Sequence, residues 1–250
     1  MYRKERFDRI TAIAEARGFV TVKTLTNELH YSTATVNRDL NILSQMGRIR
    51  RTAGGVEPIK TRGIPLPYRY EKMKPEKKRI ARVAASYIKD GDTVFIDGST
   101  TCQYMGEYLL EKKDVSVVTN NIALAAFLSE SGVSVTVIGG KVVEPPAMLS
   151  GDLAVENAMH LSVDKFFFSP GCMSSDGNVC ALGTTYVLLD IVLAERAKET
   201  FLLVDHDKID VPYKRVMFDV TRVKYVISDY EFNSATQERY KDTVFITVGE

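Results

Sequence analysis

The 250-residue sequence has no tryptophan and only three cysteines and three histidines. Cys102, Cys172 and Cys180 fit neither a CxxC nor a zinc-ligand spacing, and the histidines are scattered without partners. We therefore expect reduced thiols, no disulfide framework, no metal site and no cofactor. No apolar run reaches the roughly 18 residues that a membrane helix needs, and no apolar stretch follows the basic N-terminus as in a secretion signal. These absences favour a cytoplasmic protein without a membrane partner.

The N-terminal part of the sequence shows the periodicity of short helices. Apolar residues at helical spacing predict a first helix over residues 3–17 that ends at Gly18. Thr21 or Thr24 is placed to cap a second helix whose leucines, Leu25 and Leu29, face inward. The interpretation of this part as an ordinary helical subdomain with a solvated face stays open at this point.

A third helix and a basic hairpin follow. Ser32 is a suitable N-cap for a helix running to about residue 46, with Val36, Leu40 and Leu43 on its inner side. Gly47 ends this helix, and Gly54-Gly55 permits the tight turn of a hairpin. Helix, glycine break and basic hairpin together are typical of a winged helix-turn-helix, an α+β domain that binds double-stranded DNA.

The outer side of the third helix is polar and carries no carboxylate, as a major-groove reader requires. We predict that bases are read by Asn37, Asn41, Gln45 and Thr35. Much of the affinity is expected from Arg38 and from the hairpin arginines, which lie along the phosphate backbone or at the minor groove. The predicted DNA-binding residues are Thr33, Ala34, Thr35, Asn37, Arg38, Asn41, Gln45, Arg48, Arg50 and Arg51.

The charge of the chain is divided between its two ends. Residues 1–82 carry 19 Lys and Arg against 8 Asp and Glu, a net charge of +11, while the rest carries 14 against 24, a net charge of −10. The overall charge of +1 conceals this separation. A basic end on an acidic body is the footprint of a nucleic-acid-binding protein, because phosphate neutralisation releases counterions.

Composition also predicts the domain organisation. We expect a DNA-binding domain over residues 1–58, a partly stiff linker rich in proline over 59–74, and an effector-sensing and oligomerisation domain over 75–250. A helix is predicted over 74–89. Its basic start, Lys77-Lys78-Arg79, is interpreted as a solvated face, with a phosphate-binding role as the alternative.

The C-terminal part alternates short apolar runs with helical stretches. This alternation predicts an α/β domain with a mainly parallel sheet covered by helices on both faces. Strands are predicted over 93–96, 115–118, 133–138, 165–168, 201–204, 223–227 and 244–248. Helices are predicted over 102–110, 122–130, 153–161 and 186–198.

Ligands of such sheets bind beyond the carboxyl ends of the strands. Small and polar residues follow each of the first predicted strands, and together they favour a polar pocket that tolerates phosphate. Each motif alone is equally typical of an ordinary turn. The predicted effector-binding residues are Asp97, Gly98, Ser99, Thr100, Thr101, Thr119, Asn120, Asn121, Gly139, Gly140, Lys141, Ser169, Gly171, Cys172, Asp205 and Lys208.

The whole chain resembles the DeoR family of bacterial transcriptional regulators. The N-terminal resemblance lies in Ser32-x-x-Thr35-Val36-x-Arg38-Asp39-Leu40, followed by Gly47-x-Ile49-x-Arg51 and Gly54-Gly55. The C-terminal resemblance lies in Asp90-Gly91-Asp92, Asp97-Gly98-Ser99-Thr100-Thr101, Val118-Thr119-Asn120, Gly139-Gly140, Gly151 and Asp205-x-x-Lys208. The resemblance implies a repressor of sugar-utilisation genes that a phosphorylated sugar intermediate releases. It also implies a C-terminal fold similar to ribose-5-phosphate isomerase.

The sequence departs from this family pattern near the predicted pocket. Many members carry a glutamate and a lysine four residues apart on the helix before the Asp-x-x-Lys segment, where this chain has Tyr186 and Asp190. Glycines common near 169 and 172 are Ser169 and Cys172 here. A carboxylate in place of a lysine weakens phosphate binding if it points inward, so an effector with differently placed charge is the alternative.

Two other classes of protein compete with a homodimeric or homotetrameric repressor. The first is a sugar-phosphate isomerase in which Asp97, Asp205 and Lys208 act as acid, base and electrophile. Against it, Ser169-Pro-Gly-Cys172 stands where the isomerase resemblance requires an acidic cluster. The second is a constitutive DNA-binding architectural protein, which leaves the predicted pocket without a role.

Overall fold

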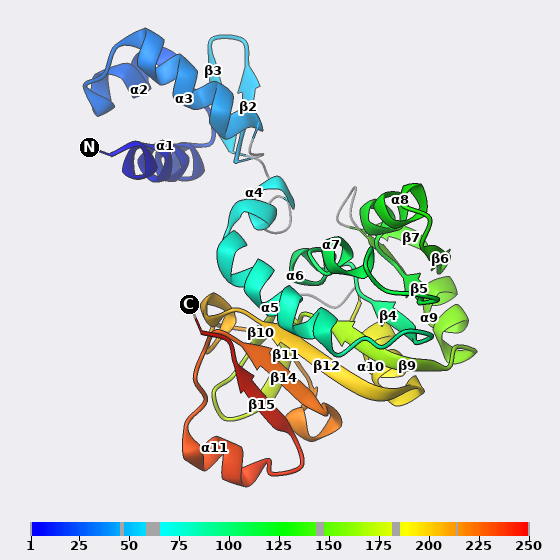
Figure 1. The fold of residues 1–250 in the computed structure, drawn as a ribbon. Coiled ribbons are helices and arrows are strands. Elements are labelled where there is room, and N and C mark those ends of the chain that lie inside the picture. The colour runs from blue at the N-terminus through cyan, green and yellow to red at the C-terminus, as the bar shows by residue number, and fades with distance from the viewer. Residues whose placement is uncertain are drawn as a thin grey trace. The chain divides into compact units, whose positions relative to one another are not determined.

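The computed structural model describes residues 2–45, 48–58, 66–143, 148–181, 186–213 and 215–249, with 66–68 in backbone only. The chain divides into two compact units, Met1–Lys72 and Met73–Glu250. We call them the reading unit and the sensor unit, and Figure 1 labels their elements. Within the predicted linker, Leu66–Glu71 form the short helix α4. Among the described helices, none is both long and apolar enough to cross a membrane.

The reading unit has the predicted helices and hairpin. Its helices are α1 (Arg3–Arg17), α2 (Val22–Leu29) and α3 (Thr33–Gln45). Strands β2 (Ile49–Thr52) and β3 (Gly55–Pro58) form the hairpin, and β1 (Val20–Thr21) pairs with β3, all antiparallel. The winged helix-turn-helix prediction is thus confirmed. The predicted end of the third helix at Gly47 lies outside the described residues.

Local sequence explains where these helices begin and end. Gly18 adopts φ 77° after α1, a conformation that glycine tolerates best. Thr21 rather than Thr24 caps α2, because the Thr24 amide donates to its Oγ1 at 3.1 Å. The Thr35 amide donates to Ser32 Oγ at 3.2 Å, which confirms Ser32 as the cap of α3.

The core of the reading unit is apolar but encloses an ion pair between α1 and α3. The inward face of each helix supplies fully buried side chains, among them Ile10, Leu25 and Leu40. Arg6 of α1 donates to both carboxylate oxygens of Asp39 on α3, at 2.7 and 3.1 Å, and Asp39 is 2% exposed. This bidentate pair holds α1 against α3, and the helical periodicity did not indicate it.

The sensor unit is built on a parallel sheet, as predicted. In the described part of the chain this sheet has seven strands in the order β15-β14-β12-β9-β4-β5-β6. Their bounds are β4 (Thr93–Ile96), β5 (Ser116–Thr119), β6 (Ser134–Val137), β9 (Val163–Phe168), β12 (Ala197–Val204), β14 (Tyr225–Ser228) and β15 (Val244–Thr247). All neighbouring pairs run parallel.

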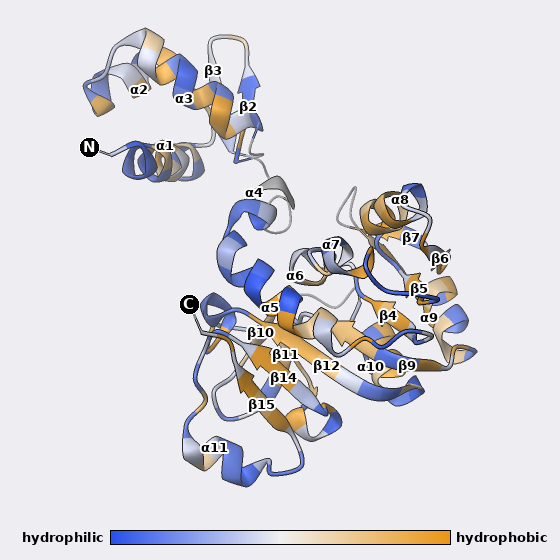
Figure 2. Cartoon of the chain, viewed as in Figure 1, coloured by the Kyte–Doolittle hydropathy of each residue, from blue (hydrophilic) through white to orange (hydrophobic). Residues whose placement is uncertain are grey.

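Helices cover both faces of this sheet. Phe167 packs in one apolar cluster with α5 (Lys74–Ser86), α6 (Thr100–Gln103), α7 (Gly106–Leu109) and α8 (Ile122–Glu130). Its neighbours Phe166 and Phe168 point to the opposite face and pack with α9 (Asp152–Met159) and α10 (Val187–Arg196). Figure 2 shows the hydrophobic strands between these layers. Because alternate side chains of β9 point to opposite faces, this strand contributes to the hydrophobic cores on both sides of the sheet.

Several elements were not predicted. These are the hairpin of β7 (Lys141–Val143) with β8 (Met148–Ser150), the sheet of β10 (Cys172–Met173), β11 (Asn178–Ala181) and β13 (Arg215–Asp219), the helix α11 (Ser234–Arg239), and the 3-10 turns η1 (His206–Lys208) and η2 (Val220–Arg222). The helix predicted over 102–110 is wrong, because the chain forms α6 and α7 with a break at Tyr104 and Met105.

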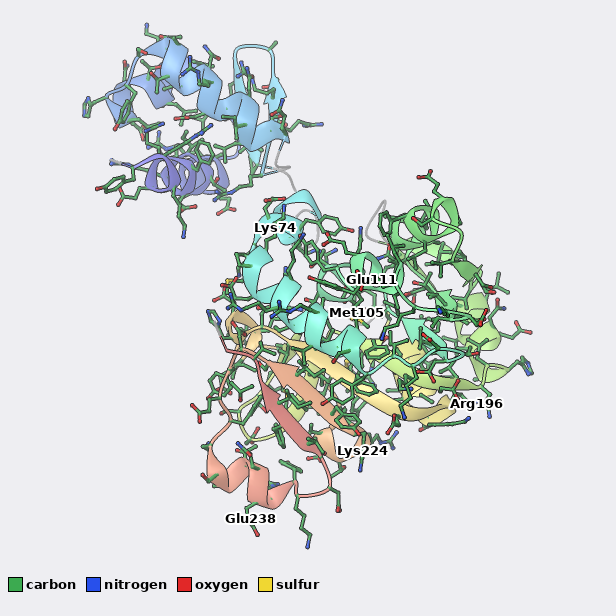
Figure 3. All side chains as sticks on the ribbon, viewed as in Figure 1. Lys74, Met105, Glu111, Arg196, Lys224 and Glu238 are labelled. Carbon is green, nitrogen blue, oxygen red and sulfur yellow. The ribbon has the colours of Figure 1, made fainter. Side chains whose placement is uncertain are left out.

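The helix predicted to extend to residue 198 ends earlier. Arg196, labelled in Figure 3, is the last residue of α10, and Ala197 already takes the extended backbone of β12. Parallel pairing of Ala197 with Val163 of β9 outweighs the helix-favouring local sequence.

Candidate nucleic-acid interface and effector site

The outer side of α3 presents the predicted base-reading residues to solvent. Ala34, Arg38, Asn41 and Gln45 are exposed, and Asn37 is half-buried. In contrast, Thr35 is partly used in capping, since its hydroxyl lies 2.9 Å from Ser32 Oγ. Base reading by these side chains stays a prediction. Their exposure on one face of α3 suits an element that enters the major groove.

Arg51 connects the wing to the reading helix. Its guanidinium donates to Asn37 Oδ1 at 2.9 Å and to Asn41 Oδ1 at 3.0 Å. Because both amide oxygens accept from Arg51, the amide NH2 groups remain to donate to base acceptors. Arg51 therefore orients two of the predicted base-reading side chains while its own charge stays at the surface.

The other two wing arginines are paired within the reading unit. Arg48 binds Asp8 of α1 at 2.9 Å and its side chain is 14% exposed, while Arg50 binds Glu57 of β3 at 2.5 Å. These carboxylates neutralise part of the wing charge. Among the predicted phosphate contacts, Arg38 and Arg51 thus carry the largest share of unneutralised charge at the surface.

The predicted effector site lies where the strand order reverses. From β4 the chain adds β5 and β6 on one side, whereas β9, β12, β14 and β15 extend the sheet on the other. Ligands of open parallel sheets bind at such a switch point, beyond the carboxyl ends of the two strands concerned. Here these ends are Asp97 after β4 and Ser169 after β9.

Asp97 is held between these two strand ends. It is 6% exposed and accepts from the Ser99 amide and hydroxyl at 3.1 and 2.6 Å and from the Ser169 amide at 3.1 Å. Burial raises the pKa of the Asp97 carboxyl, and the hydrogen bonds from Ser99, Cys102 and Ser169 oppose this rise.

Lys208 joins the site from the end of β12. Its Nζ donates to Ser169 Oγ at 2.7 Å and lies 4.0 Å from Asp205 Oδ2. Ser169 Oγ lies 3.4 Å from the Thr101 hydroxyl. The predicted residues Asp97, Thr101, Ser169, Asp205 and Lys208 thus form one contiguous polar cluster, which we call the switch-point cluster.

Lys77 on α5 contacts Thr100, the neighbour in sequence of the cluster residue Thr101, contrary to its interpretation as a solvated residue. The side chain is buried, at 4% exposure, and Nζ donates to Thr100 Oγ1 at 3.2 Å. Its spacing was a usable signal, because positions 77, 80, 81 and 84 share one helix face and the last three are apolar. A lysine on an apolar helix face predicts a buried ammonium group that donates to a specific acceptor.

Two buried oxygens near the strand ends have no hydrogen-bond partner among the described residues. They are Asn120 Oδ1 and Asp205 Oδ2, in side chains that are each 2% exposed. Buried acceptors in native structures are normally satisfied by a protein group, an ordered water or a ligand, and Asp205 Oδ2 also has the Lys208 ammonium at 4.0 Å.

Other predicted effector residues have structural roles. Thr119 Oγ1 donates to the Ile96 carbonyl at 2.6 Å, and Asn121 Oδ1 caps α8. A Cβ on Gly98 would lie 2.4 Å from Met148 Cβ, and one on Gly140 2.7 Å from the Ser150 carbonyl. These residues are explained by capping and close packing, and their predicted contact with an effector stays a prediction.

The remaining predicted residues lie apart from the switch-point cluster or pack elsewhere. The Gly139 amide donates to Asn157 Oδ1 at 3.3 Å, and Lys141 is exposed on β7. Gly171 precedes β10, where Cys172 is buried opposite Cys180. Burial raises the pKa of Cys180 to about 12, so this thiol stays protonated at neutral pH.

A winged DNA-reading unit on a parallel α/β unit with a polar switch-point cluster defines the class of ligand-responsive transcriptional regulators. Residues 6–62 match the DeoR-like helix-turn-helix domain, and residues 72–230 match the DeoR C terminal sensor domain. The chain therefore belongs to the DeoR family.

Named relatives cover nearly the same length. The chain is 29% identical to the HTH-type transcriptional repressor GlcR of Bacillus subtilis, over 94% of this chain and 92% of that protein. It is 30% identical to the lactose phosphotransferase system repressor of Lactococcus lactis, over 84% of each, and 26% identical to the glycerol-3-phosphate regulon repressor of Escherichia coli, over 92% of each. A ribose-5-phosphate isomerase structure with phospho-erythronic acid is similar at TM-score 0.41 and 16% identity, over 56% of this chain and 54% of that one.

Proposed function

We propose that this chain represses a sugar-utilisation operon by binding operator DNA and that a small sugar-derived effector at the switch-point cluster releases it. The observation that carries the proposal is the convergence of Asp97, Ser169 and Lys208 from three separate strand ends. Lysine donors and carboxylate acceptors around one cluster suit a ligand with several hydroxyl groups.

The DNA side of the proposal assigns α3 to the major groove and the wing to the backbone. Two reading units from a homodimer, or from pairs within a homotetramer, contact two half-sites of the operator. The effector shifts operator affinity only through its different affinity for the two arrangements of the oligomer, typically by about 1–3 kcal/mol.

Asp97→Ala and Lys208→Ala should each weaken the effector response at least tenfold while operator binding without effector persists. Each substitution removes a charged hydrogen-bonding group from the switch-point cluster, which is worth about 1.5–3 kcal/mol. Gel shifts of operator DNA, with effectors drawn from a thermal-shift screen of sugars and sugar phosphates, measure the response. Lys241→Ala, which removes an exposed lysine that follows α11, is the matched control. An unchanged response in both cluster variants would refute this effector site.

We also propose that the chain is a regulator and not an isomerase. The oxygens of Asp97 accept from Ser99 and Ser169, an arrangement that holds a carboxylate in place rather than freeing it for proton transfer. Measurable turnover of ribose 5-phosphate by the purified chain would contradict this part of the proposal.

A further inference from the structure

Strand β6 forms one margin of the large parallel sheet, and its outer edge is open. In the described part of the chain, β6 pairs with β5 alone. The Ile138 amide donates to the Thr119 carbonyl of β5 at 3.0 Å, and the backbone groups of alternate residues point to opposite sides of a strand. The N–H and C=O groups of Val135 and Val137 therefore point away from β5. An open edge of this kind is a template for a further strand.

This edge lacks the charges and the proline that normally prevent strand pairing. Residues 131–140 contain no charged residue and no proline, and Val137 of β6 is 44% exposed. At the other margin of the sheet (Figure 1), β15 is bordered in the sequence by Lys241, Asp242 and Glu250. The charge pattern therefore favours β6, and not β15, as the edge that accepts a partner strand.

The helix that packs on β6 has an apolar outer face as well. Leu124 on the inner side of α8 shares an apolar cluster with Val135 of β6. The exposed residues of α8 before its C-terminal turn form two pairs at i,i+4 spacing and are all apolar: Ile122, Ala123, Ala126 and Phe127. Figure 2 shows this helix mainly in the colours of hydrophobic residues. A helix that is apolar on all sides is normally buried, so we expect a partner to cover this face.

The distribution of charge indicates a second copy of the chain as this partner. Residues 83–250 carry a net charge of −10, so two sensor units repel each other over much of their surface. Residues 115–140, which include β5, α8 and β6, contain a single charged residue, Glu130. Two copies can therefore meet here without opposing like charges, and an uncharged edge strand is complementary to itself. A DNA or a charged protein partner would find no counter-charge on this surface.

We propose that two copies of this chain associate through the open edge of β6 and the outer face of α8, with the β6 strands antiparallel across a two-fold axis. Antiparallel pairing of identical edges sets this axis perpendicular to the sheet, so both α8 helices lie on the same side and pack against each other. On the other side, a Cβ on Gly139 would lie 3.3 Å from Leu153 Cδ2, so the exposed Leu153 of α9 adds apolar surface. This interface does not depend on the effector site, and it supplies the contact between copies in the proposed repressor.

Val137→Lys should raise the dissociation constant between copies at least about tenfold, because it brings like charges together across the interface. The side chain is exposed in the single chain, so the fold accommodates the lysine. Val244→Lys is the matched control, because Val244 is 42% exposed on β15 and should leave association unchanged. Sedimentation equilibrium of the full chain measures the constant. A native chain that sediments as a monomer, or Val137→Lys copies that associate as tightly as native ones, would overturn the proposal.

Ala126→Arg tests the helical part of the interface. Ala126 is exposed on α8, so an arginine fits the single chain but obstructs the second α8 across the axis. We expect association to weaken at least about tenfold, since the two arginines also repel each other. Ala235→Arg, at an exposed alanine of α11, should associate as the native chain does. Native association in Ala126→Arg would refute this arrangement of the two copies.

Hydrogen exchange tests the strand pairing itself. In the associated native chain, the outward amides of Val135 and Val137 should exchange slowly, because they donate to carbonyls of the second copy. Dilution to the monomer should make both exchange fast, while the Ile138 amide, which donates to Thr119 within one copy, stays protected. Fast exchange of both outward amides in the associated chain would mean that the copies meet at another surface and would overturn the proposal.

Discussion

Arg6→Ala should unfold the reading unit at a temperature at which the sensor unit is still folded. The substitution leaves the Asp39 carboxylate buried, at 2% exposure, without its bidentate partner. Breaking a buried ion pair in this way costs about 3–5 kcal/mol. Loss of the Arg6 contact with the Tyr31 ring, at 4.8 Å, adds to the cost.

This loss of folding stability is large for a domain as small as the reading unit. The reading unit spans Met1–Lys72, and domains of that size are stabilised by roughly 4–10 kcal/mol in total. In the described part of the chain, its core cluster is made of its own residues, so its unfolding is expected to be a separate transition. Two-step thermal unfolding by circular dichroism and calorimetry, together with loss of operator binding, measures the effect.

Two further variants test whether the unpaired, buried Asp39 carboxylate causes the loss of stability. Arg9→Ala, an exposed arginine on the same helix, should change stability little. The double variant Arg6→Met with Asp39→Leu should restore most of the lost stability, because an apolar pair of similar volume leaves no buried charge. If Arg6→Ala melts like the native chain, the ion pair does not hold α1 against α3.

Arg51→Ala should weaken operator binding about 10- to 100-fold with the reading unit still folded. Arg51 supplies a surface charge and also orients Asn37 and Asn41 through their amide oxygens, at 2.9 and 3.0 Å. The variant should therefore lose discrimination between operator and unrelated DNA as well as affinity, since a bidentate base contact is worth about 1–3 kcal/mol.

Arg38→Ala should behave differently, because Arg38 is exposed on α3 and its predicted role is a phosphate contact. Its loss should weaken binding to operator and unrelated DNA alike and reduce the salt slope by about one unit. Titrations of both DNAs at several salt concentrations distinguish the two variants. Arg82→Ala, an exposed arginine on α5, is the matched control. Native affinity in both α3 and wing variants would contradict the predicted interface.

Much of the fold follows from local sequence. The helices of the reading unit and the main strands of the sensor unit carry clear periodicity, and glycine or hydroxyl residues mark ends such as Gly18 and Ser32. The elements that were not predicted depend on pairing with strands that are distant in the sequence. Strand β11 pairs with β13, although α10 and β12 lie between them in the sequence, and β12 begins at Ala197 because β9 lies beside it.

The functional residues also divide into those that the sequence predicted and those that it did not. Residues after strand ends were found because a parallel sheet gathers its carboxyl ends at one edge. Lys77 and Asp39 were missed as buried charged residues, because a periodic pattern assigns charge to the solvent side. Both occupy an inward helix position, so a charged residue within an apolar stripe was the signal available in the sequence.

We infer that the basic reading unit binds DNA through its phosphates while the sensor unit binds a small metabolite. The most direct measurement is the affinity of the purified chain for the DNA upstream of its own gene across a range of salt concentrations. We predict binding whose log–log slope is negative, by about 0.9 for each phosphate neutralised. Binding that is absent at low salt, or that does not change with salt, would contradict the account.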